Sequence, residues 1–229
     1  MTSDYEEVTI DVKGTLALIR LETTDEFIVR EIFHSNTYRK LDVRPDDVVL
    51  DVGMNIGAFT IYALQKGAFV HSFEPEPKNF SMARHNILLN KIDTGFILHQ
   101  KAVVGNDDAE RPLSINVRRN KGLHSLIPKR GRDTIMVSCM NINHILQTVR
   151  PTVIKMDIEG GEYECLKAVE SFKGVREMIF EFHHAHLNDV KTKEKYKETT
   201  DLMRRHFKTV QFKEDTKGAW VSLVYCNDE

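Results

Sequence analysis

The chain has 229 residues, with 32 Lys or Arg against 34 Asp or Glu, so its formal net charge is −2. This balance lacks the basic excess typical of nucleic-acid-binding proteins, and no apolar run approaches the roughly 20 residues of a membrane-spanning helix. The polar, acidic start does not resemble a secretory signal. The 3 cysteines form no C-x-x-C pair, which is typical of free thiols in a cytoplasmic protein.

Helices and strands alternate along most of the chain. The sequence predicts an N-terminal hairpin over 8–22, helices at 25–34, 58–66 and 78–90, and strands at 48–52, 69–74 and 96–103. It further predicts strands at 153–157 and 178–183, helices at 161–170 and 193–207, and a closing antiparallel pair at 209–213 and 219–226. Strands separated by helices indicate a doubly wound, mostly parallel α/β sheet. We expect one domain over residues 1–229, with residues 1–40 as an N-terminal extension.

A glycine-rich turn follows the first strand of this predicted sheet. Asp51 near the end of the strand, then Gly53, Asn55 and Gly57, occupy alternate positions that lead into the next helix. Such a turn lets a ligand approach the backbone closely and directs the free N–H groups of a helix start toward it. The spacing matches neither the G-x-G-x-x-G dinucleotide fingerprint nor a Walker A loop. The pattern therefore indicates an adenosine-containing cofactor of another kind.

The second strand ends in a carboxylate. Residues 69–73 lead into Glu74, which lies roughly 20 residues beyond the glycine turn, and Pro75 and Pro77 end the strand. At this offset a carboxylate can accept hydrogen bonds from both ribose hydroxyls of a nucleoside. The alternative is a solvated charge at a strand end, with Glu76 as the cap of the next helix.

A third group of acids follows the strand at 153–157. Asp157 ends this buried strand, and Glu159, two glycines and Glu162 come next. Ligands bind at the carboxyl edge of open α/β sheets, and an acid that ends a buried strand is costly unless it has a partner or a task. For Glu162 a simpler alternative is a favourable interaction with the helix dipole, and Glu164 is expected on a solvated face.

Three segments together resemble the FkbM-type family of S-adenosylmethionine (SAM)-dependent methyltransferases: Asp51-x-Gly53-x-Asn55-x-Gly57, Phe73-Glu74-Pro75, and residues 155–162 with their Asp-x-Glu-Gly element. Residues 86–90 and 180–183 are also similar to that family. The resemblance spans roughly residues 45–185. It implies a class I, Rossmann-like fold with a seven-stranded, mostly parallel sheet and an antiparallel last strand. It also implies SAM as the methyl donor and S-adenosylhomocysteine as the product.

The resemblance implies that SAM is held by Asp51, Gly53, Asn55, Gly57 and Glu74. The other cofactor-binding candidates lie beside these residues or at neighbouring strand ends: Met54, Phe59, Pro75, Asn79, Gln100, Lys101, Ala102 and Asp157. Many class I relatives carry Asp or Asn near the adenine, where this chain has Gln100-Lys101-Ala102. Because Lys101 cannot accept a hydrogen bond from the adenine amino group, that contact would pass to the backbone or to Gln100.

Known members of this family methylate hydroxyl oxygens, often on sugars or polyketide-derived products. An alcohol is a poor nucleophile at neutral pH, so it needs a general base or a metal. The candidate catalytic residues are Asp157, Glu159, Glu181 and His183. A divalent metal on Asp157, Glu181 and His183 is an alternative that we do not favour, because strand alternation does not by itself turn the last two toward Asp157. His184 and His186 are expected to be exposed loop residues.

Residues 111–132 are rich in Lys and Arg and are expected to form a mobile loop. The loop is either a solvated segment or a positive wall over the acceptor site, where His124 and Ser125 could hydrogen-bond a sugar. We favour an O-methyltransferase acting on a glycan, a nucleotide-linked sugar or a similar small hydroxylated acceptor. The alternatives are an RNA methyltransferase that uses this loop and a non-catalytic SAM-binding module. Balanced charge and the lack of interleaved aromatics count against RNA, and the acids retained at the strand ends count against the module.

Overall fold

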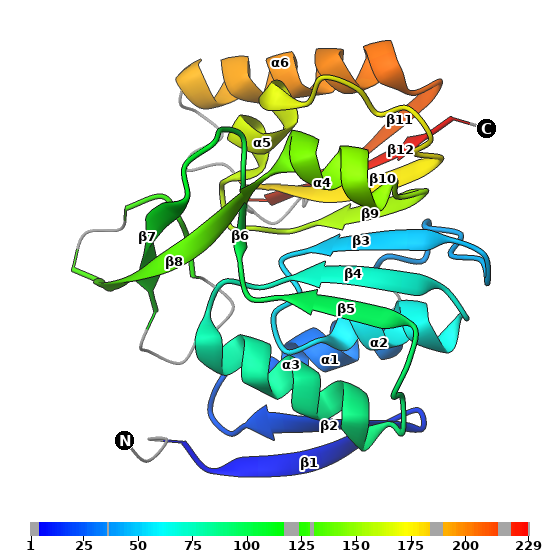
Figure 1. The fold of residues 1–229 in the computed structure, drawn as a ribbon, viewed down its shortest axis with the longest axis vertical. Coiled ribbons are helices and arrows are strands. Elements are labelled where there is room, and N and C mark those ends of the chain that lie inside the picture. Colours follow the sequence, from blue (N-terminus) through cyan, green and yellow to red (C-terminus); the bar gives the residue numbers. More distant parts are fainter. Residues whose placement is uncertain are drawn as a thin grey trace.

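A seven-stranded sheet forms the centre of the computed structural model, which describes residues 5–35, 37–116, 124–128, 131–183, 190–214 and 221–228 (Figure 1). The strand order is β11-β12-β10-β9-β3-β4-β5. These strands are β3 (Val48–Val52), β4 (Phe69–Phe73), β5 (Phe96–His99), β9 (Val153–Met156), β10 (Glu177–His183), β11 (Thr209–Glu214) and β12 (Val221–Asn227). β12 runs antiparallel to both neighbours and the other adjacent pairs are parallel, which confirms the expected sheet.

Helices cover both faces of this sheet. One face packs against α1 (Asp25–Phe33), α2 (Ala58–Gln65) and α3 (Pro77–Leu89), and the other against α4 (Ile142–Val149), α5 (Glu162–Ala168) and α6 (Val190–His206). Because side chains alternate along a strand, Val49 of β3 joins the first core cluster and Leu50 joins the second. Burial on both faces explains the nearly continuous apolar sequence of β3. Within the described ranges, none of the helices is long and apolar enough to cross a membrane.

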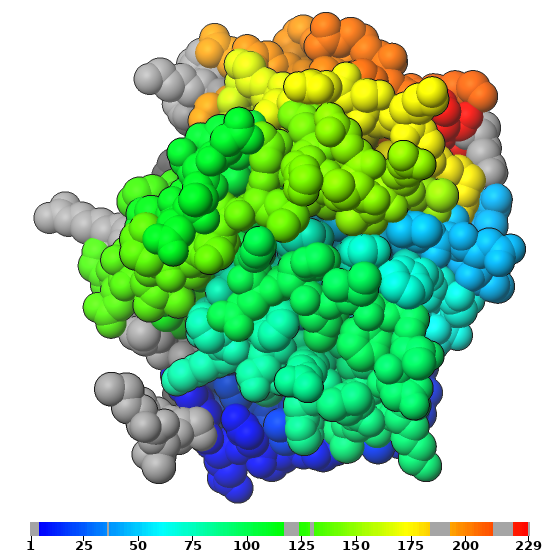
Figure 2. All heavy atoms as spheres, in the orientation of Figure 1, coloured from blue at the N-terminus to red at the C-terminus, as the bar shows by residue number. Residues whose placement is uncertain are grey.

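The expected N-terminal hairpin is confirmed as β1 (Glu7–Val12) and β2 (Thr15–Arg20), which pair in a sheet of their own. The hairpin lies at the opposite end of the molecule from α6 (Figures 1 and 2). Two amide side chains attach it, Asn86 of α3 and Asn90 at the C-cap of this helix. Asn86 Oδ1 accepts from Leu18 N at 2.7 Å, and Asn90 Oδ1 accepts from Leu16 N at 2.9 Å. Both amides also donate back to the carbonyl oxygens of those residues, and Asn86 donates to Ile56 O at 2.9 Å. The two side chains therefore pair with β2 as a neighbouring strand would.

The structure departs most from the sequence expectation between residues 96 and 141. The strand expected over 96–103 divides into β5 and β6 (Ala102–Val104), and β6 joins a separate sheet with β8 (Asp133–Asn141) and β7 (Glu110–Ile115). β7 occupies part of the segment expected to be a mobile loop, of which 117–123 and 129–130 lie outside the described residues. The pairing of β7 with β8 joins segments far apart in sequence, so no local pattern indicates it. α4 was likewise not predicted.

Replacing Asn86 with alanine is expected to lower the free energy of unfolding by about 2–4 kcal/mol. The side chain is buried, so its loss leaves the N–H and C=O of Leu18 and the C=O of Ile56 without their present partner. Chemical denaturation measures the change. The exposed Arg84 of the same helix provides the control, since Arg84→Ala should change the value by no more than about 0.5 kcal/mol. Equal effects of the two substitutions would contradict the docking role of Asn86.

Candidate functional site

The glycine-rich turn between β3 and α2 lies against two other parts of the fold. Gly53 has φ 85°, and a Cβ at this position would lie 1.7 Å from the carbonyl oxygen of Asp157. Gly57 has φ 90°, and a Cβ there would lie 3.1 Å from Ala83 Cα on α3. The N–H groups of Gly53 and Met54 both donate to Phe73 O, at 3.0 and 2.9 Å. Glycine is thus required at both positions, because the turn contacts the end of β9 and the side of α3 through its backbone.

Asp51 supports this turn from below. Its side chain is 0% exposed; Oδ2 accepts from Thr60 Oγ1 at 2.7 Å, and Oδ1 lies 3.2 Å from Lys155 Nζ. Lys155 also donates to Gly53 O at 2.6 Å. Burial lowers the pKa of Lys155, but the carboxylates of Asp51, Asp157 and Glu181 outweigh this effect and leave the pKa raised. Asp51 therefore pairs with a buried cation beneath the turn, and its expected contact with the cofactor stays a prediction.

A pocket opens beside the turn at the carboxyl ends of β3, β4 and β9, and we call it the glycine-loop pocket. Its lining contains eight of the cofactor-binding candidates: Gly53, Asn55, Glu74, Pro75, Asn79, Lys101, Ala102 and Asp157. Met54 and Phe59 line a different pocket, described below, and Gln100 is exposed. Sequence reasoning missed Leu113 and Leu126, whose approach to the pocket depends on the unpredicted β7.

Glu74 is fixed inside the glycine-loop pocket and is not the solvated charge considered as its alternative. It is 5% exposed, and its two carboxylate oxygens accept from Asn55 N and Glu76 N, each at 2.9 Å. Burial raises the pKa of Glu74 to about 7, although the two backbone N–H groups act in the opposite direction. Glu76 is the helix cap, as its alternative role proposed, since it accepts from Asn79 N at 2.6 Å. Each oxygen of Glu74 keeps a lone pair for a ligand hydroxyl.

Asn55 offers a second unsatisfied group to the same ligand. Its side-chain Oδ1 is buried and accepts no hydrogen bond from the described residues. Asn55 has φ 53°, a left-handed conformation that Asn tolerates better than most residues. A buried acceptor without a donor is costly in a folded protein. The pocket therefore suits a ligand with hydroxyl or ammonium donors, as the nucleoside and amino-acid parts of SAM provide.

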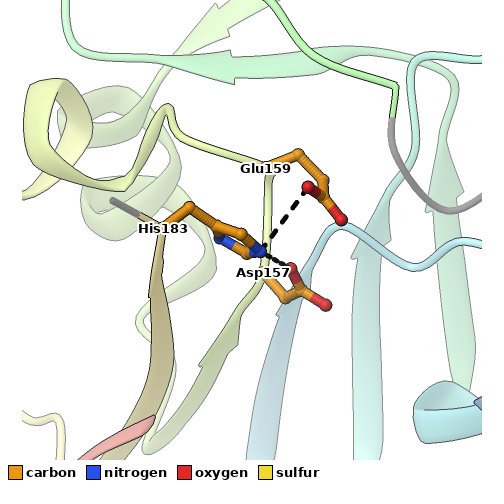
Figure 3. Close-up of side chains that lie close together, drawn as sticks. All are labelled: Asp157, Glu159 and His183. Carbon is orange, nitrogen blue, oxygen red and sulfur yellow. Dashed lines mark ion pairs between the residues drawn. The ribbon is translucent and has the colours of Figure 1, made fainter. Parts of the chain in front are cut away.

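Three of the four expected catalytic residues meet at the ends of β9 and β10 (Figure 3). His183 Nε2 lies 3.5 Å from Glu159 Oε2 and 3.8 Å from Asp157 Oδ1. On the other side of the ring, Nδ1 lies 3.0 Å from Glu162 Oε1. The buried Glu162 carboxylate also accepts the N–H groups of Ile158 and Gly160. Glu162 thus joins the turn after β9 to His183. From the sequence, the simpler alternative for Glu162 was only an interaction with the helix dipole.

The pKa values of this group depart strongly from their ordinary values. Burial lowers the pKa of His183, but the hydrogen bond with Glu162 and the surrounding carboxylates raise it to about 10. Burial raises the pKa of Glu159 to about 8; His183 opposes this shift, and Asp157 and Glu162 add to it. In this arrangement the surrounding carboxylates favour the protonated ring of His183.

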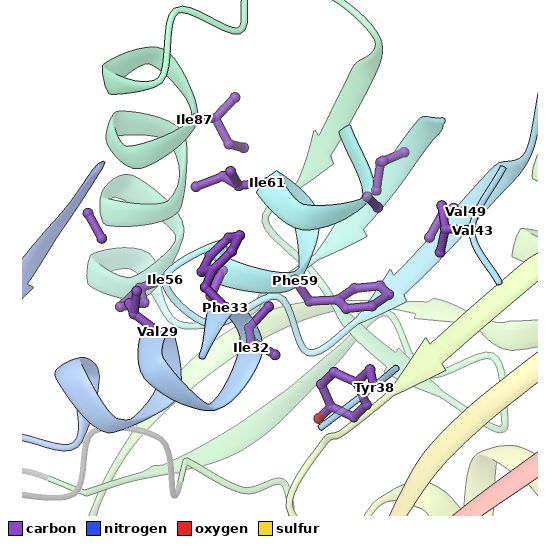
Figure 4. Packing of buried hydrophobic residues seen from close by; sticks show 14 of the residues in the cluster. Val29, Ile32, Phe33, Tyr38, Val43, Val49, Ile56, Phe59, Ile61 and Ile87 are labelled. Carbon is purple, nitrogen blue, oxygen red and sulfur yellow. The ribbon is translucent and has the colours of Figure 1, made fainter. Parts of the chain in front are cut away.

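Glu181 is separate from the His183 group and belongs to a second pocket. Its Oε1 accepts from Tyr38 Oη at 2.8 Å, and burial together with the charge of Asp157 raises the pKa of Glu181 to about 7. Burial and Glu181 also raise the pKa of Tyr38. Tyr38 packs edge to face against Phe59, with ring centroids 5.4 Å apart (Figure 4). Tyr38 thus connects the N-terminal segment to the end of β10.

This second pocket, which we call the α1-walled pocket, has Phe27, Ile28, Glu31 and Ile32 of α1 on one side. Met54, Phe59, Tyr38, Lys155 and Glu181 complete the wall. Four residues line both pockets: Gly53, Asn55, Asp157 and Glu159. The two pockets therefore meet at the turn after β3 and the turn after β9. The N-terminal segment, expected only as an extension, supplies part of the candidate site.

The described residues of the basic segment 111–132 give little support to the idea that it forms a positively charged surface over the acceptor site. Arg111 Nη1 and Nη2 bond to the carboxylate of Glu164 at 2.9 and 2.7 Å, so this arginine already has an anionic partner. Ser125 Oγ donates to Glu159 O at 2.7 Å and is buried, which corrects its expected role as a sugar ligand. His124 lines the glycine-loop pocket, with Nδ1 accepting from Asn116 N at 3.0 Å, and its expected sugar contact stays a prediction. Other residues singled out in the basic segment or after β10 lie outside the described ranges: Arg118, Arg119, Lys121, Lys129, Arg130, His184 and His186.

Comparison with known proteins identifies the family. The family model described as the methyltransferase FkbM domain matches residues 51–212. The chain is 41% identical over 71 residues to the 31-O-demethyl-FK506 methyltransferase FkbM of Streptomyces tacrolimicus, covering 29% of this chain and 27% of that protein. It is 24% identical over 178 residues to the hexuronic acid methyltransferase AglP of Haloferax volcanii, covering 76% and 73%.

The solved structures confirm the fold. The structure of M. jannaschii TYW2 in complex with AdoMet superposes with a TM-score of 0.55 at 13% identity, covering 99% of this chain and 87% of that one. Identity this low supports the architecture alone. The family match includes the glycine-rich turn, Glu74 and the acids after β9 within its bounds. The chain belongs to the FkbM methyltransferase domain family and is a SAM-dependent methyltransferase.

Proposed function

We propose that this methyltransferase transfers the methyl group of SAM to a hydroxyl of a carbohydrate or a similar small hydroxylated acceptor. The observation that supports this most directly is the meeting of the two pockets at Asp157 and Glu159. One pocket fits the nucleoside of SAM, and the other brings carboxylates to the same boundary. An alcohol must lose its proton as it is methylated, so carboxylates beside the methyl donor suit a hydroxyl acceptor.

In this proposal Glu74 accepts hydrogen bonds from the ribose hydroxyls, and Asn55 Oδ1 accepts one from the donor's amino-acid part. SAM, when bound, supplies a methyl group already activated on a sulfonium. The protein then has to align the acceptor hydroxyl and remove its proton. We assign the proton to Glu181, which lines the α1-walled pocket and has one oxygen held by Tyr38. Its other oxygen remains for the acceptor.

The names of two relatives support methyl transfer to an oxygen atom. One relative's name specifies a 31-O-demethyl substrate and another's specifies a hexuronic acid. The RNA alternative loses support, because Arg111, a described arginine of the basic segment, is bound to Glu164 and Asp108. The α1-walled pocket has apolar or aromatic lining residues that suit an acceptor with an apolar portion, among them Phe27, Ile28, Ile32 and Phe59.

Methyl transfer into fractionated cell extract tests the acceptor class. With SAM carrying a radiolabelled methyl group, we expect label in the glycan or small-molecule fraction and background counts in RNA, lipid and protein. We expect this because carboxylates at the boundary of the two pockets suit a hydroxyl acceptor, and because Arg111 is already bound to Glu164 and Asp108. Label mainly in RNA would replace the proposal with the RNA methyltransferase alternative, and label mainly in lipid or protein would contradict a carbohydrate or small-molecule acceptor.

The affinity for S-adenosylhomocysteine is expected to depend on pH through Glu74. Because the pKa of Glu74 is raised to about 7, the ionised carboxylate that binds two hydroxyls predominates above that pH. Calorimetric titration should show a constant affinity above pH 8 and a decrease below pH 7 that approaches about tenfold per pH unit. Glu74→Gln should weaken binding at pH 8 by about 10- to 100-fold and remove the pH dependence.

Glu76→Gln is the matched control for this measurement. Glu76 is a neighbouring buried carboxyl group that caps α3 and does not line the glycine-loop pocket. Its variant should keep a pH dependence, with a midpoint slightly below that of the parent chain, because the charge of Glu76 contributes to the raised pKa of Glu74. An affinity that does not change with pH in the parent chain would contradict the ribose role of Glu74.

Glu181→Gln is expected to reduce kcat by about 100-fold or more while changing the affinity for S-adenosylhomocysteine by less than about threefold. The amide keeps the size of the side chain but cannot take a proton from the acceptor. Tyr38→Phe removes the hydrogen bond to Oε1 and keeps the carboxylate, so its loss of rate should be much smaller. Rates are measured on the extract fraction that accepts label. A larger loss for Tyr38→Phe than for Glu181→Gln would contradict the assignment.

A further inference from the structure

Three side chains at the boundary of the two pockets have the spacing of metal ligands. One oxygen of Asp157, one oxygen of Glu159 and one ring nitrogen of His183 lie within 4.8 Å of one another. The distances from Nε2, 3.5 and 3.8 Å, exceed those of good hydrogen bonds. Ligands at about 2.1 Å from a small divalent cation are about 3–4 Å apart. The gap between these three atoms therefore matches the space that such an ion occupies.

His183 is oriented as a metal-binding histidine is. Metal-bound histidines almost always direct the other ring nitrogen to a carboxylate or a carbonyl group, which fixes the ring and its tautomer. Here Nδ1 lies 3.0 Å from Glu162 Oε1, and Glu162 is 1% exposed and held by the N–H groups of Ile158 and Gly160. With Nδ1 bonded in this way, Nε2 faces the two acids (Figure 3).

Two further features of the acids indicate a missing ligand. Asp157 Oδ1, the oxygen that faces His183, is buried and accepts no hydrogen bond from the described residues. Glu159 has φ 57°, a left-handed conformation that costs energy for a residue other than glycine. Ser125 Oγ, bonded to Glu159 O at 2.7 Å, helps to hold this conformation. Strain of this kind persists where the surroundings impose it, and it is frequent at ligand sites.

We propose that Asp157, Glu159 and His183 bind one divalent cation, of the Mn²⁺ or Mg²⁺ class, which coordinates the acceptor hydroxyl. Carboxylate oxygens suit both ions, and a single imidazole suits Mn²⁺. Three protein ligands leave coordination positions for water and for an acceptor oxygen. When the ion binds, Nε2 of His183 loses its proton to solvent and coordinates the ion in its place. The catalytic part of this inference rests on the proposed function, because a bound cation would lower the pKa of a hydroxyl that Glu181 then deprotonates.

This ligand set differs from the one considered from sequence. Glu181 was a candidate ligand, but its Oε1 accepts from Tyr38 at 2.8 Å, and its carboxylate is not in the group within 4.8 Å. Glu159 takes that place because the turn after β9 brings its side chain back toward β10. Lys155, the other cation beside Asp157, is bound to Asp51 and Gly53. It therefore does not fill the gap between the three ligand atoms.

Mn²⁺ titration of the full chain, without SAM or acceptor, tests the site directly. The electron paramagnetic resonance signal of free Mn²⁺ measures the bound fraction, and we expect one ion per chain. Asp157→Asn and His183→Gln should each raise the dissociation constant by more than about tenfold, and Glu162→Gln by about 10- to 100-fold through its hold on the ring. Circular dichroism of each variant checks that the fold is retained. Mg²⁺ should displace the bound Mn²⁺ in competition.

Glu181→Gln is the matched control, since it removes a nearby carboxylate charge without removing a ligand. Its dissociation constant for Mn²⁺ should stay within about threefold of the parent value. Absence of stoichiometric binding, or an equal loss in Glu181→Gln and Asp157→Asn, would overturn the site. Because this titration contains no acceptor, its result is independent of which extract fraction is methylated. Mn²⁺ binding combined with methyl transfer that a chelator does not reduce would overturn the catalytic role of the ion.

Discussion

The close approach of the turn after β3 to the end of β9 is the constraint on which the rest of the site depends. The carbonyl oxygen of Asp157 occupies the space where a side chain at residue 53 would begin. Only glycine permits this contact at a positive φ. The contact places Asp157 beside Asn55, so that both residues line both pockets. A larger residue at position 53 would separate the two turns and with them the two pockets that meet there.

Charge balance is the second organising feature. Asp51, buried beneath the turn, is paired with Lys155, and Lys155 also holds the carbonyl oxygen of Gly53. At the end of β10, three carboxylates surround the ring of His183. Buried charges require partners. Here Lys155 also holds the turn after β3, and Glu162 also holds the turn after β9. The electrostatic pairing and the geometry of the site are therefore parts of one arrangement.

The segments outside the central sheet complete the site. The hairpin β1–β2 is attached to α3 and its C-cap through Asn86 and Asn90, and the following α1 forms one side of the α1-walled pocket. From the other direction, Ser125 bonds to the backbone of Glu159. These additions lie on either side of the carboxyl ends of the strands, where functional residues concentrate in this type of fold. The sheet supplies the scaffold, and the additions supply part of the walls of the two pockets.

Local sequence determined the sheet, the glycine-rich turn, the position of Glu74 and the acids after β9, because periodicity, glycine spacing and strand-end residues are short-range signals. It also determined the family, through three segments that keep their order along the chain. Only the tertiary structure decided that Asp51 supports the turn from a buried position, that Glu162 orients His183, and that Glu159 rather than Glu181 joins the histidine. These outcomes depend on which strand ends lie side by side and how each turn directs its side chains. Contacts between residues far apart in sequence set both, and no local pattern encodes them.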